Sequence, residues 1–71
     1  MLRTETVRAL AELAREHRAQ IEFRPTGSGH DKATIMLAGR SRFIILSRSP
    51  HGSNLKRALG DARRALRELS A

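Results

Sequence analysis

The sequence predicts an α+β fold with the element order α-β-β-β-α, in which two helices pack on one face of a three-stranded antiparallel sheet. Two amphipathic helical segments lie near the ends of the 71-residue chain. Between them are three short segments with strand-like alternation, the last two joined by a glycine-containing turn. A chain of this length forms one domain, so residues 1–71 are expected to fold as a single unit.

The first element is an amphipathic helix over residues 4–18. Thr4 is its expected N-cap, and Glu5 lies in the first turn, where the helix dipole favours an acidic residue. Residues three and four positions apart form one apolar stripe: Val7, Leu10, Ala11, Ala14 and His17, with Leu13 at its edge. His17 ends this stripe and is expected to be a partly buried structural histidine.

Three strands follow, over residues 20–24, 32–38 and 42–47. Pro25 ends the first strand, and the glycine-rich loop RPTGSGHDK leads into the second. Gly39-Arg40 predicts a two-residue type II′ hairpin loop between the second and third. This register pairs Met36 with Phe43 and Leu37 with Arg42.

Both faces of the predicted hairpin are apolar. One carries Met36, Ala38, Phe43 and Ile45, and the other carries Ile35, Leu37, Ile44 and Leu46, flanked by Arg42 and Arg48. Helices on one side leave the second face exposed, which predicts a protein partner or a homodimer through the sheet. The expected contacts are Ile35, Leu37, Ile44 and Leu46. The alternative is a slipped register or a curled sheet that hides this face.

The last element is a helix over residues 55–69, with Ser53 as its expected N-cap after a turn-rich connector. Its apolar face consists of Leu55, Ala58, Leu59, Ala62, Ala65, Leu66 and Leu69. Lys56, Arg63 and Arg67 share the other side, with Arg57 and Arg64 beside them. Gly60 interrupts the helix and points outward by periodicity.

The charge predicts a polyanionic partner. The chain has 14 Lys and Arg against 7 Asp and Glu, a formal net charge of +7, and the excess falls after residue 20. Arginine dominates, and its planar fork suits phosphate; the alternative is that these arginines are only solvated surface charges. RNA or duplex DNA is the expected partner. The expected nucleic-acid contacts are Lys32, Arg40, Arg42, Lys56, Arg57, Arg63, Arg64 and Arg67.

The same composition limits other functions. Cysteine is absent, which excludes disulfides and thiolate metal sites, and no cofactor or metal is expected. Apolar runs are too short for a membrane span or a signal peptide, so a soluble, cytoplasmic protein without a membrane partner is expected. Phe23 and Phe43 are the only aromatic residues and both are expected in the core, which argues against stacking on bases.

His30 is the candidate catalytic residue. RNA supplies its own nucleophile in the 2′-OH, so one positioned imidazole can act as general acid or base while arginines neutralise the phosphate. The alternative is that GSGH is a plain turn. Whether the protein is an enzyme is therefore left open by the residues.

The order of elements resembles the double-stranded-RNA-binding-domain-like fold and, more narrowly, the HicA family of mRNA-interferase toxins. The residues that carry the resemblance are TGSGHDKATI (26–35), the Gly-Arg hairpin at 39–40, SRSPHG (47–52) and SNLKRALGDARRAL (53–66). Small phage-encoded HicA-like proteins are similar as well.

The resemblance implies a small basic RNA-binding domain from a toxin–antitoxin system, acting in a bacterial or phage-infected cell. It implies a metal-independent endoribonuclease whose catalytic histidine falls on His30, after Gly27 and Ser28. Gly29 is an insertion relative to the family motif. The alternative function is a non-catalytic, phage-encoded adaptor or inhibitor that binds a host protein through the apolar sheet face.

Overall fold

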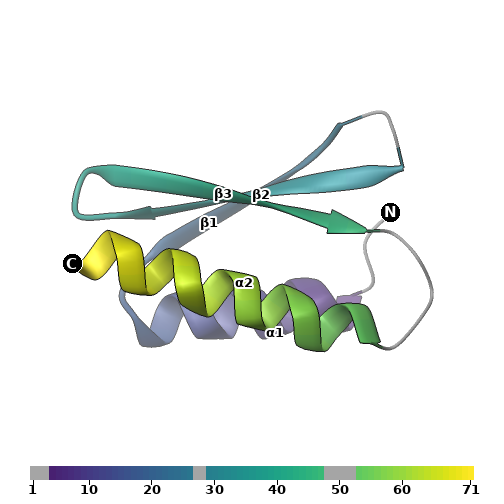
Figure 1. Cartoon of the computed structure of the whole chain (residues 1–71), viewed down its shortest axis with the longest axis horizontal. Helices are drawn as coiled ribbons and strands as arrows, with labels where there is room; N and C mark the ends of the chain where they lie inside the picture. The colour runs from purple at the N-terminus through teal and green to yellow at the C-terminus, as the bar shows by residue number, and fades with distance from the viewer. Residues whose placement is uncertain (1–3, 27–28, 48–52) are drawn as a thin grey trace.

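The computed structural model of the chain describes residues 4–26, 29–47 and 53–71. Its elements are α1 (Thr4–Glu16), β1 (Gln20–Pro25), β2 (His30–Leu37), β3 (Arg40–Ser47) and α2 (Ser53–Ser70). The three strands form one antiparallel sheet in the order β1-β2-β3, so β2 is central (Figure 1). The predicted α+β fold with α-β-β-β-α order is confirmed.

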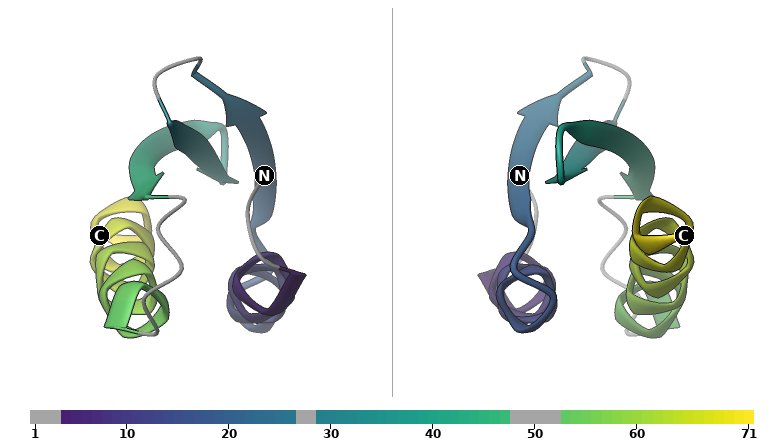
Figure 2. Two further views of the ribbon diagram at one scale, coloured as in Figure 1. Left: turned by 90° about the vertical axis from the view of Figure 1, so that its right-hand side faces the viewer. Right: turned by 90° about the vertical axis from the view of Figure 1, so that its left-hand side faces the viewer.

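Both helices lie on the same face of the sheet. α1 packs beneath β1 and α2 packs chiefly beneath β3, and the two helices also contact each other (Figure 2). The core between the layers is formed by Leu10, Leu13, Ala33, Ile35, Ile44, Leu46, Ala58, Ala62, Ala65, Leu66 and Leu69. The opposite face of the sheet, called the outer face below, has no helix over it in the described part of the chain.

α1 ends two residues earlier than the sequence predicts. Arg18 adopts a left-handed conformation with φ of 58°. The Arg18 N–H donates to the Arg15 carbonyl at 3.0 Å, and the Ala19 N–H donates to the Ala14 carbonyl at 2.8 Å. This is a Schellman ending, in which left-handed backbone closes the last turn. The prediction of a partly buried His17 is wrong, because His17 lies beyond the helix and is exposed.

The β2–β3 hairpin has a different register from the predicted one. Ala38 and Gly39 form the two-residue loop, with φ of 53° and 79°. Positive φ at both positions defines a type I′ turn, whose twist matches that of the flanking strands. Met36 therefore pairs with Ser41, and Leu37 pairs with Arg40.

The shift in register leaves each residue on its predicted face, because the partners move by two residues and side chains alternate with period two. The prediction of which face is exposed was nevertheless wrong. Ile35, Ile44 and Leu46 are buried against the helices, and Leu37 is half-buried on the same face. Exposed apolar side chains lie on the outer face instead.

α2 begins at Ser53 and carries the apolar stripe that the sequence predicts. Ala58, Ala62, Ala65, Leu66 and Leu69 are all buried. Gly60 is exposed, and a methyl group built at its Cα would meet no atom within 4 Å among the described residues. None of the helices in the described residues is long and apolar enough to cross a membrane.

Candidate functional site

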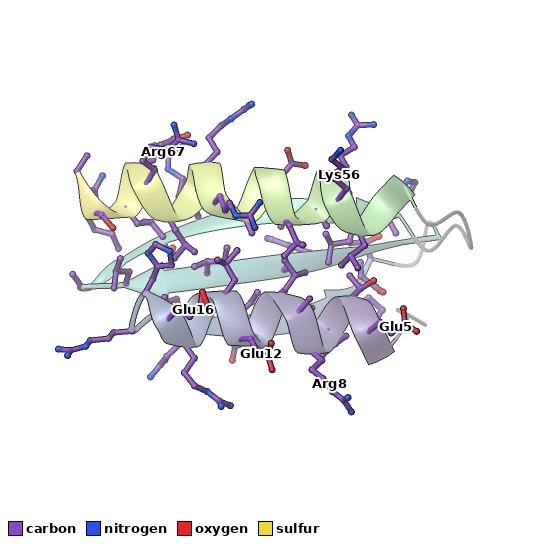
Figure 3. All side chains as sticks on the ribbon, turned by 90° about the horizontal axis from the view of Figure 1, so that it is seen from below. Glu5, Arg8, Glu12, Glu16, Lys56 and Arg67 are labelled. Carbon is purple, nitrogen blue, oxygen red and sulfur yellow. The ribbon has the colours of Figure 1, made fainter. Side chains whose placement is uncertain are left out.

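The exposed side of α2 carries a group of basic residues that we call the basic ridge: Lys56, Arg57, Arg63, Arg64 and Arg67. At 3.6 residues per turn these five positions fall within an arc of about 120° opposite the buried stripe. All five side chains are exposed, and Figure 3 shows Lys56 and Arg67 on α2 as seen from the helix side. Among the described residues none of the five forms an ion pair, so their charges face solvent.

The two acidic residues of α2 lie beside the basic ridge. Asp61 and Glu68 lie on the flank of the helix between the ridge and the buried stripe, and both are half-buried. Glu68 is bound by Arg42 of β3, with 2.9 Å between Nη1 and Oε2. The ridge therefore carries five positive charges along the helix, with Asp61 at its edge between Arg57 and Arg64.

Arg40 and Arg42 differ from the ridge residues, although the sequence groups them together as nucleic-acid contacts. Both project to the helix-covered face of β3. Arg42 pairs with Glu68, and the Arg40 Nη1 donates to the Ala71 carbonyl at 3.1 Å. These two guanidinium groups bind within the chain and hold β3 to the end of α2.

His30 is the first residue of β2, not a residue of the preceding loop as the sequence suggests. The His30 carbonyl accepts two hydrogen bonds from Thr26, from its N–H at 3.1 Å and from its Oγ1 at 2.8 Å. Gly29 has φ of 80°, a conformation that side chains strongly disfavour. Gly29 thus allows the chain to turn into β2, and the two hydrogen bonds from Thr26 hold the backbone of His30.

His30 shares the outer face with the candidate Lys32 and with Arg24, which sequence reasoning did not single out. Asp31, Ala33 and Ile35 of β2 are buried, so the alternate residues His30 and Lys32 point the opposite way. Lys32 pairs directly with Arg24 of β1, which is exposed. His30, Lys32 and Arg24 therefore form a basic cluster at one end of the outer face.

This cluster and the basic ridge lie in different layers of the molecule. The ridge belongs to α2 beneath the sheet, and the cluster lies on the face turned away from α2 (Figure 2). The sequence treats His30 and the α2 arginines as parts of one site. The fold does not place them together, so one phosphate group cannot contact both.

His30 and its neighbour Asp31 do not lie on the same face of β2. Consecutive strand residues point to opposite faces, and His30 is exposed while Asp31 is buried. Ser28, Gly27, Arg48 and His51 lie outside the described residues. Residues 4–26, 29–47 and 53–71 contain no cluster of three or more side chains suited to holding a metal ion.

Sequence reasoning missed the most distinctive apolar feature of the surface. Phe43 is 58% exposed and Ile45 is 50% exposed, although Phe43 was expected in the core. Phe23, by contrast, is half-buried against the core. The segment RFIILS is apolar on both faces, so it indicates that Ile44 and Leu46 share one face and Phe43 and Ile45 the other, but not which of the two faces is buried.

No protein-family model, curated protein or solved structure matches the chain.

Proposed function

We propose that the protein is a small basic RNA-binding domain that contacts the phosphate backbone through the basic ridge of α2. The observation that carries the proposal is the set of five exposed cations on one side of a single helix, none of which forms an ion pair among the described residues. Arg63 and Arg64 each lie one turn from Arg67, and like charges at this spacing destabilise a helix by about 0.2–0.5 kcal/mol per pair, a cost that a bound polyanion would remove. Four of the five are arginines, which bind phosphate oxygens bidentately.

The dimensions of the ridge suit several successive phosphates. Lys56 and Arg67 are separated by about 16 Å along the helix axis, at 1.5 Å of rise per residue. If all five cations displace counterions, the affinity should fall as salt is added. A plot of the logarithm of the binding constant against the logarithm of the salt concentration should then have a slope of about −3.5 for a single strand and about −4.5 for a duplex. Binding is thus expected to be strongly salt-dependent.

Cleavage of the bound RNA is a second candidate activity, and the cluster of His30, Lys32 and Arg24 supports it. An imidazole at His30 can remove the proton of a ribose 2′-OH. The 2′-oxygen then attacks the adjacent phosphorus, and the 5′-oxygen leaves with a proton from water, giving a 2′,3′-cyclic phosphate and a 5′-hydroxyl. Lys32 and Arg24 can neutralise the charge that develops on the phosphate oxygens. This chemistry needs no metal and would make the protein a toxin-like endoribonuclease.

The test measures binding and cleavage together. Wild type and His30→Ala are incubated with end-labelled RNA, and with DNA of the same sequence, across a series of salt concentrations. Salt-dependent binding of RNA by both proteins supports the binding domain, and cleavage by the wild type alone supports the ribonuclease.

Two results would contradict these proposals. Equal products from wild type and His30→Ala would exclude the histidine as catalyst. Absence of RNA binding by either protein at low salt would overturn the binding proposal and favour an adaptor that binds a protein.

A further inference from the structure

The edge of the molecule formed by β3 combines a charged surface and an apolar surface. α2 and its basic ridge lie beneath β3. Phe43 and Ile45 project from the outer face of the same strand. An RNA strand that crosses this edge can therefore contact the basic ridge on one side of β3 and the ring of Phe43 on the other.

We infer that Phe43 is a stacking platform for an unpaired base, and that the RNA bound by this protein is single-stranded where it crosses β3. The inference rests on the proposed RNA binding and specifies its substrate. Aromatic rings on the surface of a sheet bind single strands because every base offers a flat π-face. Bases within a duplex have their faces covered by their neighbours and cannot stack in this way.

The surroundings of Phe43 match such a ligand in charge. The Lys32 Nζ lies over the Phe43 ring, 4.5 Å from its centroid, in a cation–π contact, so a base would stack on the face of the ring that Lys32 does not cover. Lys32 stands between Arg24 and Ile45 in the sheet. The one described acidic side chain on this face, Glu22, is on β1, with Thr34 between it and Phe43. A base on Phe43 would therefore have its phosphates near Lys32 and away from Glu22.

An exposed apolar pair on an edge strand could instead be covered by a protein. The charge argues for RNA, because Lys32 lies beside Ile45, Arg24 lies beyond Lys32, and the chain as a whole carries a formal charge of +7. A second copy of this chain would bring the same positive charges together. Phe43 and Ile45 also form a small patch, with Thr34 and Lys32 beside them, and obligate interfaces need a larger apolar area.

The test uses Phe43→Trp, which creates the only tryptophan in a chain that has none. Stacking on a base is expected to quench its fluorescence when oligouridylate is added, and an RNA duplex of equal length should leave it unchanged. Phe43→Leu keeps an apolar side chain and removes the ring. It should weaken oligouridylate binding by about 5- to 100-fold and change duplex binding by less than about twofold. Ile45→Ala is the matched control on the same strand and face, with little effect expected on either RNA.

The outcomes separate this inference from the proposed function. If an Arg63→Gln/Arg67→Gln variant weakens binding while Phe43→Leu does not, and the tryptophan is not quenched, the ridge binds RNA and the stacking platform is wrong. If the wild type binds neither RNA, both fail. A dimer in sedimentation that dissociates on Phe43→Leu, with unchanged RNA binding, would also overturn the stacking role.

Discussion

The two helices meet the same packing requirement and present different surfaces to solvent. Each lies under one side of the sheet and buries an apolar stripe against it. The exposed side of α1 mixes signs, with Glu5, Glu12 and Glu16 beside Arg8 and Arg15, and Figure 3 shows Arg8 and Glu12 on the side turned away from α2. The exposed side of α2 carries the five cations of the basic ridge.

The comparison shows which surface charges the fold requires and which it does not. α1 shows that a helix in this position can be stable with balanced surface charge, which is the ordinary arrangement on a solvated face. Packing therefore does not explain why α2 carries five cations on its outer side. The excess charge on one helix only is the reason to assign binding to α2, and α1 serves as its internal control.

The largest expected effect is a loss of stability, and it should be similar for the two helices. Leu10 of α1 and Leu66 of α2 are each 1% exposed, so Leu10→Ala and Leu66→Ala should each lower the free energy of unfolding by about 2–5 kcal/mol. Urea denaturation followed by circular dichroism measures both. A loss below about 1 kcal/mol for either variant would mean that the corresponding helix is not packed as the structure has it.

The second largest effect is a loss of RNA affinity, which should follow substitutions on α2 and not those on α1. Arg63→Gln/Arg67→Gln and Arg8→Gln/Arg15→Gln remove the same charge and keep similar helix propensity. The α2 pair should weaken RNA binding by about 10- to 100-fold at low salt and make the salt slope shallower by about 2. The α1 pair should change affinity by less than about threefold, through net charge alone. Equal losses would indicate a diffuse charge effect with no binding surface on α2.

A smaller effect is expected at Gly60, which lies on the exposed side of α2 among the ridge residues. Gly60→Ala should raise the free energy of unfolding by about 1 kcal/mol, because alanine restricts the unfolded chain and meets no neighbouring atom in the described structure. RNA titration then shows whether the methyl group interferes with the ligand. Lower affinity despite greater stability would indicate close approach of RNA to the helix backbone at this point.

The smallest effect concerns the end of α1. Arg18 adopts φ of 58°, which costs about 1 kcal/mol or more for a residue with a side chain. Arg18→Gly should remove this backbone strain. Glycine also gives the unfolded chain more conformational entropy, which offsets part of the gain, so the net stabilisation should be roughly 0.5 kcal/mol. Thermal denaturation detects it as a small rise in Tm. A decrease would mean that the Arg18 side chain contributes a contact that outweighs the strain.

Much of the fold could be predicted because local patterns decide it. The 3.6-residue stripe of α2 and the alternation in β2 and β3 each determine an element without reference to the rest of the chain. The charge of the basic ridge was predictable for the same reason, since helical periodicity alone groups Lys56, Arg63 and Arg67 on one side. The end of α1 was less predictable, because arginine is an unusual residue for a left-handed helix ending.

The candidate site was only partly predictable. His30 and Lys32 were identified as residues, but the alternation of β2 places them on the outer face and α2 packs on the other. Arg40 and Arg42 were predicted to contact nucleic acid because they are basic. Their bonds to Ala71 and Glu68 depend on where the end of α2 lies, which no local pattern specifies.

The sequence by itself determined the order of elements, the residues that share each face of the hairpin, and the basic side of α2, because all three follow from short-range periodicity and charge. Only the tertiary structure decided which face of the sheet the helices cover. Both faces of the hairpin are apolar, so burial of Ile35, Ile44 and Leu46 and exposure of Phe43 and Ile45 depend on where α1 and α2 dock. That choice is made by long-range packing, and it places an aromatic ring on the outer face in contact with Lys32.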